Sequence, residues 1–273
     1  MKKYIIILVL ASLIFSQSEQ PYPPLELVSI PTAGTLPKGT YTYETILSKN
    51  GSVMPRLAIG LTPSLTHGIS YGMHGVIGDT KPIFNTNPGF HVKYRAFDEN
   101  ASRPALLLGI NTQGKGKYTE VDKFNISNDG EIESINKQIK RYEKKALGFF
   151  ISLSKNWEFF GNLGFHMGIN KNILEKTGHP EDDNEINIFF GFDKEINRSF
   201  SILLECDAGL NDNQDEYEFE DLTFGRGKGF VNAGLRWTVV PNVLVEINFN
   251  DLKKNSKAEY VNREIKIMYS ESF

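Results

Sequence analysis

The sequence predicts an all-β protein: a transmembrane, antiparallel, up-and-down β-barrel of about twelve strands. Three observations favour this fold class. Segments with alternating apolar and polar residues recur from residue 40 onward, short and long connections between them alternate, and the chain ends on an aromatic residue, Phe273.

Residues 1–18 have the pattern of a secretory signal peptide. Two lysines follow the first methionine, and residues 5–15 form an apolar run. That run is too short for a spanning helix, which takes about 20 residues. Cleavage is expected after Ser18, with cleavage after Ser16 as the second option. The leader therefore predicts a secreted chain.

Residues 19–39 are proline-rich. They are expected to form a periplasmic lead-in, because proline lacks the backbone N–H that a β-ladder needs. The barrel is then assigned to residues 40–273.

The clearest strand is FHVKYRAF, residues 90–97. Its aromatic and aliphatic side chains fall on one face, and His91, Lys93 and Arg95 fall on the other. This arrangement is typical of a wall between lipid and a polar lumen. By the same alternation, the polar side chains expected to line the lumen are Arg56, His91, Lys93, Arg95, Glu205, Asp207, Arg236, Glu246 and Lys266.

The connections differ in length in a regular way. The expected short turns are residues 62–65, 98–102, 154–157, 193–198 and 240–242, and the expected long connections are residues 76–88, 113–145, 170–184, 211–228 and 251–257. Outer-membrane barrels have short periplasmic turns and long outer loops. The pattern therefore predicts an outer-membrane location with both termini in the periplasm. Within residues 113–145, the isoleucine spacing fits either a short helix or a pair of extended strands.

The last strand carries a second marker of this class. Counting back from the end, its apolar face consists of Ile265, Ile267, Tyr269 and Phe273, with Glu271 as an interruption. An outward apolar face that ends on an aromatic residue predicts an assembly signal. The partners expected from it are the barrel-assembly machinery and outer-membrane lipid.

The lumen has two interpretations. Charges of both signs predict either ion pairs that fill and close the barrel, or a weakly selective pore whose charged rings sort small solutes. Phe150, Phe189 and Leu203 fall among the polar positions. These bulky side chains favour an occluded or very narrow lumen.

Composition and motifs argue against several functions. The 30 basic residues nearly match the 33 acidic ones, so no nucleic-acid partner is expected. The one cysteine, Cys206, excludes an intramolecular disulfide and a multi-cysteine zinc site. His91 and His166 have no serine partner at an obvious spacing, so neither enzymatic chemistry nor a cofactor is expected. The acidic run 211–221 departs from the EF-hand pattern and leaves weak binding of divalent ions open.

The early part of the chain resembles a known family. The features that carry the resemblance, within residues 29–41 and just after, are Pro31-Thr32-Ala33, Gly39 and the turn Gly60-Leu61-Thr62. They are similar to the start of the YjbH-like outer-membrane proteins, a group associated with exopolysaccharide production. The resemblance implies an envelope protein that helps polysaccharide to cross or assemble at the outer membrane, with surface polysaccharide as a partner.

We therefore expect a non-enzymatic outer-membrane β-barrel with a structural or polysaccharide-export-associated envelope role. The first alternative is a narrow diffusion channel for small polar solutes. Two further alternatives are a soluble secreted β-sandwich and a barrel-embedded enzyme that acts on envelope lipid.

Overall fold

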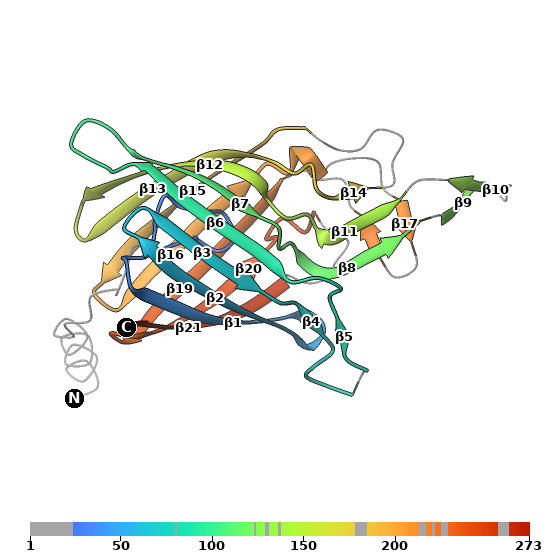
Figure 1. The fold of residues 1–273 in the computed structure, drawn as a ribbon, viewed down its shortest axis with the longest axis horizontal. Helices are drawn as coiled ribbons and strands as arrows, with labels where there is room; N and C mark the ends of the chain where they lie inside the picture. The colour runs from blue at the N-terminus through green and yellow to red at the C-terminus, as the bar shows by residue number, and fades with distance from the viewer. Residues whose placement is uncertain are drawn as a thin grey trace, which may run out of the picture.

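A closed antiparallel barrel of twelve strands forms the body of the protein (Figure 1). The structure is a computed structural model that describes residues 24–79, 81–122, 124–128, 131–135, 138–177, 185–212, 217–219, 222–224, 229–255 and 262–273. Each barrel strand pairs with the next along the chain, and the first strand pairs with both the second and the last. The predicted fold class and strand number are confirmed, and the β-sandwich alternative is wrong because a single ladder closes on itself.

The wall follows the order of the chain. Its strands are β1 (Thr40–Ser48), β2 (Ser52–Thr62), β3 (Leu65–Ser70), β6 (Gly89–Phe97), β7 (Ala105–Asn111), β12 (Gly148–Glu158), β13 (Asn162–Lys171), β15 (Asn187–Asn197), β16 (Phe200–Asp207), β19 (Phe230–Val240), β20 (Val243–Asn250) and β21 (Asn262–Ser272).

Alternation within each strand sorts the side chains between the two faces of the wall. In β6, Phe90 and Tyr94 are 48% and 51% exposed, whereas His91 and Lys93 are buried. A closed wall produces this division because successive side chains of a strand point to opposite faces. The barrel therefore has an apolar outside and a polar inside.

The two ends of the barrel differ. Phe273 lies at the end with the short turns, where its N–H donates to Gly39 O (2.9 Å) beside the start of β1. The connections at the other end are long, except for the 3-10 turn η2 (Lys49–Gly51) between β1 and β2. The turns predicted at residues 154–157 and 193–198 are wrong, because β12 and β15 continue through those stretches and the chain reverses at residues 159–161 and 198–199.

The long connections build small sheets beyond the barrel. We call one of them the rim sheet; it consists of β8 (Lys115–Val121), β11 (Ile139–Lys144) and β14 (Lys176–Thr177), at the end away from the C-terminus (Figure 1). The other short elements are β4 (Met73–His74), β5 (Ile83–Phe84), β9 (Phe124–Asn128), β10 (Glu131–Ile135), β17 (Tyr217–Phe219), β18 (Leu222–Phe224) and η3 (Leu210–Asp212). The described part of residues 113–145 is thus extended, as in the second of the two predicted alternatives.

The main departure from the prediction is N-terminal. Residues 24–37, expected to lie in the periplasmic lead-in, are inside the barrel, and most of their apolar side chains are buried there, among them Leu27, Val28, Ile30 and Leu36. Proline explains why the segment forms no strand of the wall, but the apolar side chains explain its position, because the lumen removes them from water. We call residues 24–37 the plug. The predicted signal peptide, residues 1–18, lies outside the described residues.

No helix within the described ranges is long and apolar enough to cross a membrane.

Candidate functional site

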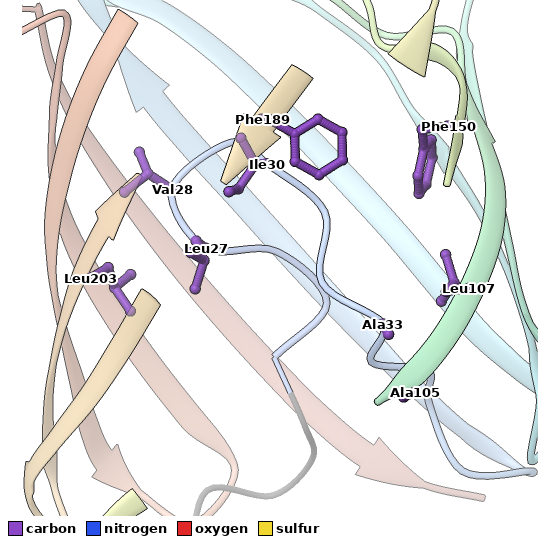
Figure 2. Close-up of a cluster of buried hydrophobic side chains, with 9 residues drawn as sticks. All are labelled: Leu27, Val28, Ile30, Ala33, Ala105, Leu107, Phe150, Phe189 and Leu203. Atoms are coloured by element: carbon purple, nitrogen blue, oxygen red, sulfur yellow. The ribbon is translucent and has the colours of Figure 1, made fainter. Parts of the chain in front are cut away.

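The plug is a tight hairpin whose tip reaches into the lumen. Leu27 N–H donates to Ile30 O (3.0 Å), which reverses the chain at Val28 and Ser29. Figure 2 shows this reversal between the walls of the barrel. A single hairpin is at best marginally stable in water. The position of the plug therefore depends on its contacts with the wall.

Apolar side chains on one part of the wall form a seat for the plug. We define the seat as Ala105, Leu107, Phe150, Phe189 and Leu203. Figure 2 shows the seat together with the plug residues that belong to the same cluster, which are Leu27, Val28, Ile30 and Ala33. The bulky residues predicted to obstruct the lumen therefore hold the plug. The plug thus packs against apolar side chains of β7, β12, β15 and β16.

Glu205 on β16 binds the tip of the plug. Its carboxylate accepts the backbone N–H groups of Val28 (2.9 Å), Ser29 (2.9 Å) and Ile30 (3.1 Å), and the Ser29 hydroxyl (2.5 Å). Asn232 Nδ2 donates another hydrogen bond to the same carboxylate (2.7 Å). Successive N–H groups that converge on an anion form a nest, and charged acceptors make the stronger hydrogen bonds. We call Glu205 the latch.

Ionic contacts hold the other side of the plug. Arg56 on β2 binds Glu26 of the plug through both Nη atoms, at 2.7 and 2.8 Å, and also donates to Glu44 on β1 (3.2 Å). Arg236 donates to Glu26 O (3.0 Å), and Lys93 donates to a neighbouring carbonyl of the plug. Removing either partner of such a buried pair leaves the other charge uncompensated. The plug and the charged wall therefore stabilise each other.

The predicted site residues occupy three places. Those buried inside the barrel are Arg56, His91, Lys93, Glu205, Asp207, Arg236, Glu246 and Lys266. Arg95 lies near the short turns, where its Nε pairs with Asp98 Oδ1 (2.7 Å). The residues of the C-terminal marker on the outer face are Ile265, Ile267, Tyr269 and Phe273. Their role in assembly stays a prediction.

The statement that His166 lacks a serine partner is wrong. Ser154 on β12 pairs directly with His166 on β13, and Ser154 Oγ lies 2.7 Å from His166 Nδ1. His166 Nε2 lies 2.8 Å from Asp193 Oδ1 on β15, so the three residue types of a nucleophilic triad meet, but with the two ring nitrogens in exchanged roles. Ser154 Oγ also accepts the N–H of Ala33 in the plug (2.7 Å), and all three side chains are buried. The arrangement anchors the plug, which covers the hydroxyl that an acyl substrate would have to reach.

Two glycines of the wall provide space for the plug. A Cβ atom at Gly191 would lie 2.7 Å from Leu27 Cδ1, and one at Gly60 would lie 2.0 Å from Pro37 O. The contact at Gly60 would displace the plug, because it involves plug backbone, whereas the contact at Gly191 would require the Leu27 side chain to shift. Gly60 belongs to the motif that resembles the YjbH-like group. In this chain, that motif therefore serves the packing of the plug.

A cavity that we call the vestibule lies between the tip of the plug and the long connections. It encloses about 740 Å³, a volume that includes space open to solvent. Two of its lysines form ion pairs, Lys144 with Asp207 (2.9 Å) and Lys115 with Glu264 (2.9 Å), and Lys145 donates to Asn211 O (3.0 Å). The amide side chains of its wall are Asn111, Gln113, Asn170, Asn187 and Asn211. Paired charges and amides suit a polar solute that exchanges hydrogen bonds with the wall.

Glu175 joins the rim sheet to the barrel. Its carboxylate accepts the backbone N–H groups of Tyr142 (3.2 Å) and Ala146 (2.8 Å) and an amide N–H of Asn172 (3.0 Å). Burial raises the pKa of Glu175 to about 7, because the charged form loses its hydration there, even though these donors favour that form. The joint is therefore the part of the rim that responds to pH near neutrality.

The acidic run 211–221 is only partly described. Asp212 accepts a hydrogen bond from Arg141 Nη2 on β11 (2.7 Å), whereas residues 213–216 and 220–221 lie outside the described residues. In the part of the chain that the structure describes, no three His, Cys, Asp or Glu side chains gather as metal ligands. Divalent-ion binding by this run stays a prediction.

Comparison with known proteins yields a likeness to membrane barrels. No family model and no curated protein matches the chain. It is similar to the solved KdgM porin, with 9% identity over 86% of this chain and 99% of that one, and a TM-score of 0.45. It is also similar to the NanC porin, with 10% identity over 85% of this chain and 99% of that one, and a TM-score of 0.44. Scores this low carry no argument about function. The class of the protein follows from its own ladder and plug: a closed β-barrel with an internal plug.

Proposed function

We propose that this chain is an outer-membrane β-barrel that its own N-terminal hairpin closes, with a non-enzymatic, structural or polysaccharide-export-associated envelope role. The observation that carries the proposal is the plug. It lies in the lumen between the seat and the charged wall, contacts both, and leaves the vestibule with a floor. An open diffusion pore would need that space.

The outer face supports a location in a membrane. Large apolar side chains are exposed around the wall, among them Ile69, Phe90, Tyr94, Phe149, Phe165, Phe190, Ile202, Ile247 and Ile267. A soluble protein rarely exposes an apolar surface of this extent. A closed barrel with an apolar band outside is the form in which β-structure spans a bilayer, because every strand of the wall is paired.

The difference between the two ends supports an orientation. In outer-membrane barrels the short turns face the periplasm. Phe273 and the start of β1 share the end with the short turns. On this orientation both termini are periplasmic and the vestibule opens outward. The export-associated part of the role extends the resemblance to the YjbH-like group and is a proposal on that basis.

The second candidate is a narrow diffusion channel for small polar solutes. The vestibule favours it, because a polar cavity at the mouth of a barrel is where such a solute would first bind. The channel requires a route past the plug.

Two experiments test the proposal. Native protein is expected to fractionate with outer membranes and to migrate differently on a gel with and without heating. In planar bilayers, the purified protein is expected to show no stable conductance steps. Conductance steps whose size depends on ion charge would contradict the closed barrel and favour the diffusion channel. Unchanged surface polysaccharide in a strain that lacks the gene would remove the export-associated role and leave the structural one.

A further inference from the structure

A second cavity continues the vestibule along one side of the plug. It lies mainly between the plug and strands β1, β2 and β6, it reaches Phe150 of the seat, and it shares Glu26, Arg56, Asn111 and Leu147 with the vestibule. We call it the polar seam. It lies on the side of the plug that makes ionic contacts, whereas the apolar seat holds the other side. The plug is therefore sealed differently on its two sides.

Buried polar atoms in the seam lack protein partners. Thr42 Oγ1, Arg56 Nε and His91 Nδ1 have no hydrogen-bond partner among the described residues, and all three side chains are more than nine-tenths buried. Buried polar groups are almost always hydrogen-bonded, either to protein or to ordered water. These atoms come from β1, β2 and β6, with β3 between the last two, and they border one cavity. A small molecule that can both donate and accept hydrogen bonds would satisfy all three atoms.

The charges of the seam indicate which kind of molecule fits. Arg56 and Lys93 stand against Glu26 and Glu44, so the formal charges cancel. Arg56 pairs with both carboxylates, and Lys93 donates to a carbonyl of the plug. An ion that entered would lose its hydration without gaining an unpaired countercharge. A neutral hydroxyl compound loses less and can bond to the three free atoms.

We propose that the polar seam is a hydrated binding site, below the tip of the plug, for water and the smallest uncharged hydroxyl compounds, which enter from the vestibule. The proposal deepens the proposed function, since it assumes that the plug stays in place. It assigns the inner site to Thr42, Arg56 and His91.

Two alanines provide a matched test. Ala58 faces the seam from β2, and Ala105 belongs to the dry seat on β7; they are 5% and 7% exposed. Each is changed to cysteine in a Cys206→Ser background. The purified, membrane-inserted variants are treated with neutral methyl methanethiosulfonate and with its anionic sulfonatoethyl and cationic trimethylammonioethyl analogues. Heat-dependent migration on a gel verifies that each variant is folded.

The expected result is selective reaction in the seam. With the neutral reagent, Ala58→Cys should react about tenfold or more faster than Ala105→Cys. Ala58→Cys should also react about tenfold or more faster with the neutral reagent than with either charged reagent, because charge is costly to dehydrate. Thr42→Cys provides a second seam position if Ala58→Cys does not fold. Equal neutral rates at the seam and the seat, or charged reagents as fast as the neutral one, would overturn the proposal. These rates report whether a reagent reaches the buried thiol, so the outcome is distinct from the membrane fractionation and conductance that test the proposed function.

Discussion

Replacing the latch should loosen the plug by a predictable amount. Glu205→Ala removes the carboxylate that accepts the N–H groups of Val28, Ser29 and Ile30, and it leaves these donors buried without an acceptor. Truncating one partner of a buried charged network costs about 3–5 kcal/mol. At about 1.4 kcal/mol per factor of ten, the population in which the plug has left the lumen should rise by roughly two to four orders of magnitude.

Hydrogen exchange of amides that do not touch the latch measures this change. Ala33 N–H donates to Ser154 Oγ, and Leu36 N–H donates to Thr66 Oγ1 (2.8 Å), so both become free only when the plug leaves its place. Exchange at these two amides should accelerate in Glu205→Ala by the same two to four orders of magnitude, because slow exchange reports the free energy of opening.

A second lumenal glutamate provides the control. Glu264 is as deeply buried as Glu205, but it binds Lys115 (2.9 Å) and Asn248 (3.2 Å) on the wall and rim. Glu264→Ala should leave the exchange of Ala33 and Leu36 close to that of the native protein. If Glu205→Ala leaves both amides as protected as before in a folded barrel, or if Glu264→Ala exposes them equally, the assignment of Glu205 as the latch fails.

Two further changes test other parts of the structure. Phe190→Arg, in the middle of the apolar band, should destabilise the inserted barrel by about 2–4 kcal/mol and reduce insertion. Phe160→Arg, at a turn where the side chain is 89% exposed, should destabilise it by only about 0–1 kcal/mol. The fraction of heat-shifted protein recovered from membranes measures the difference. Glu175 has a folded pKa of about 7 against an ordinary value of 4.5, so the folded joint retains a proton that the opened chain releases. Stability of the joint should therefore fall as pH rises from about 4.5 to about 7, by on the order of 3 kcal/mol in total, and Glu175→Gln should remove the dependence. Rim-sheet exchange, corrected for intrinsic rates, measures this effect, and equal pH dependence in both proteins would contradict it.

The wall could be predicted because the information for it is local. In β6, the alternation of residues 90–97 sets which side chains face outward, and closure of the ladder makes the division the same in every strand. The lumenal positions of Phe150, Phe189 and Leu203 follow from the same period of two. No knowledge of distant contacts is needed for these assignments.

The plug could not be placed in this way, because its position is set by distant partners. The hydrogen bond from Val28 to Glu205 joins residues 177 apart in the chain. Residues 24–37 lack a period of two, so the pattern shows only that they are not part of the wall. The signal that could have placed them was the combination of an apolar lead-in with three bulky apolar residues on the lumenal face. Neither group has another way to leave water.

The pairing of Ser154 with His166 was missed for a different reason. In a hairpin, the centre of the turn determines which residues stand opposite each other. A turn placed at residues 154–157 makes Ser154 part of the turn, whereas the actual turn, centred at Phe160, places it directly opposite His166. An error of a few residues in one turn therefore concealed a contact between two side chains of the lumen.

The strength of the seal limits how this barrel could ever conduct. Four apolar side chains of the plug are almost fully buried, Leu27, Val28, Ile30 and Leu36, and their burial is worth about 6–12 kcal/mol in total. Release of the plug would return conformational entropy of about 1–2 kcal/mol for each of its residues, and the sum of these terms is of the same order as the burial. The polar contacts at Glu205 and Arg56 therefore decide whether the plug stays in place. Flow through this barrel must pass beside the plug or follow the loss of these contacts.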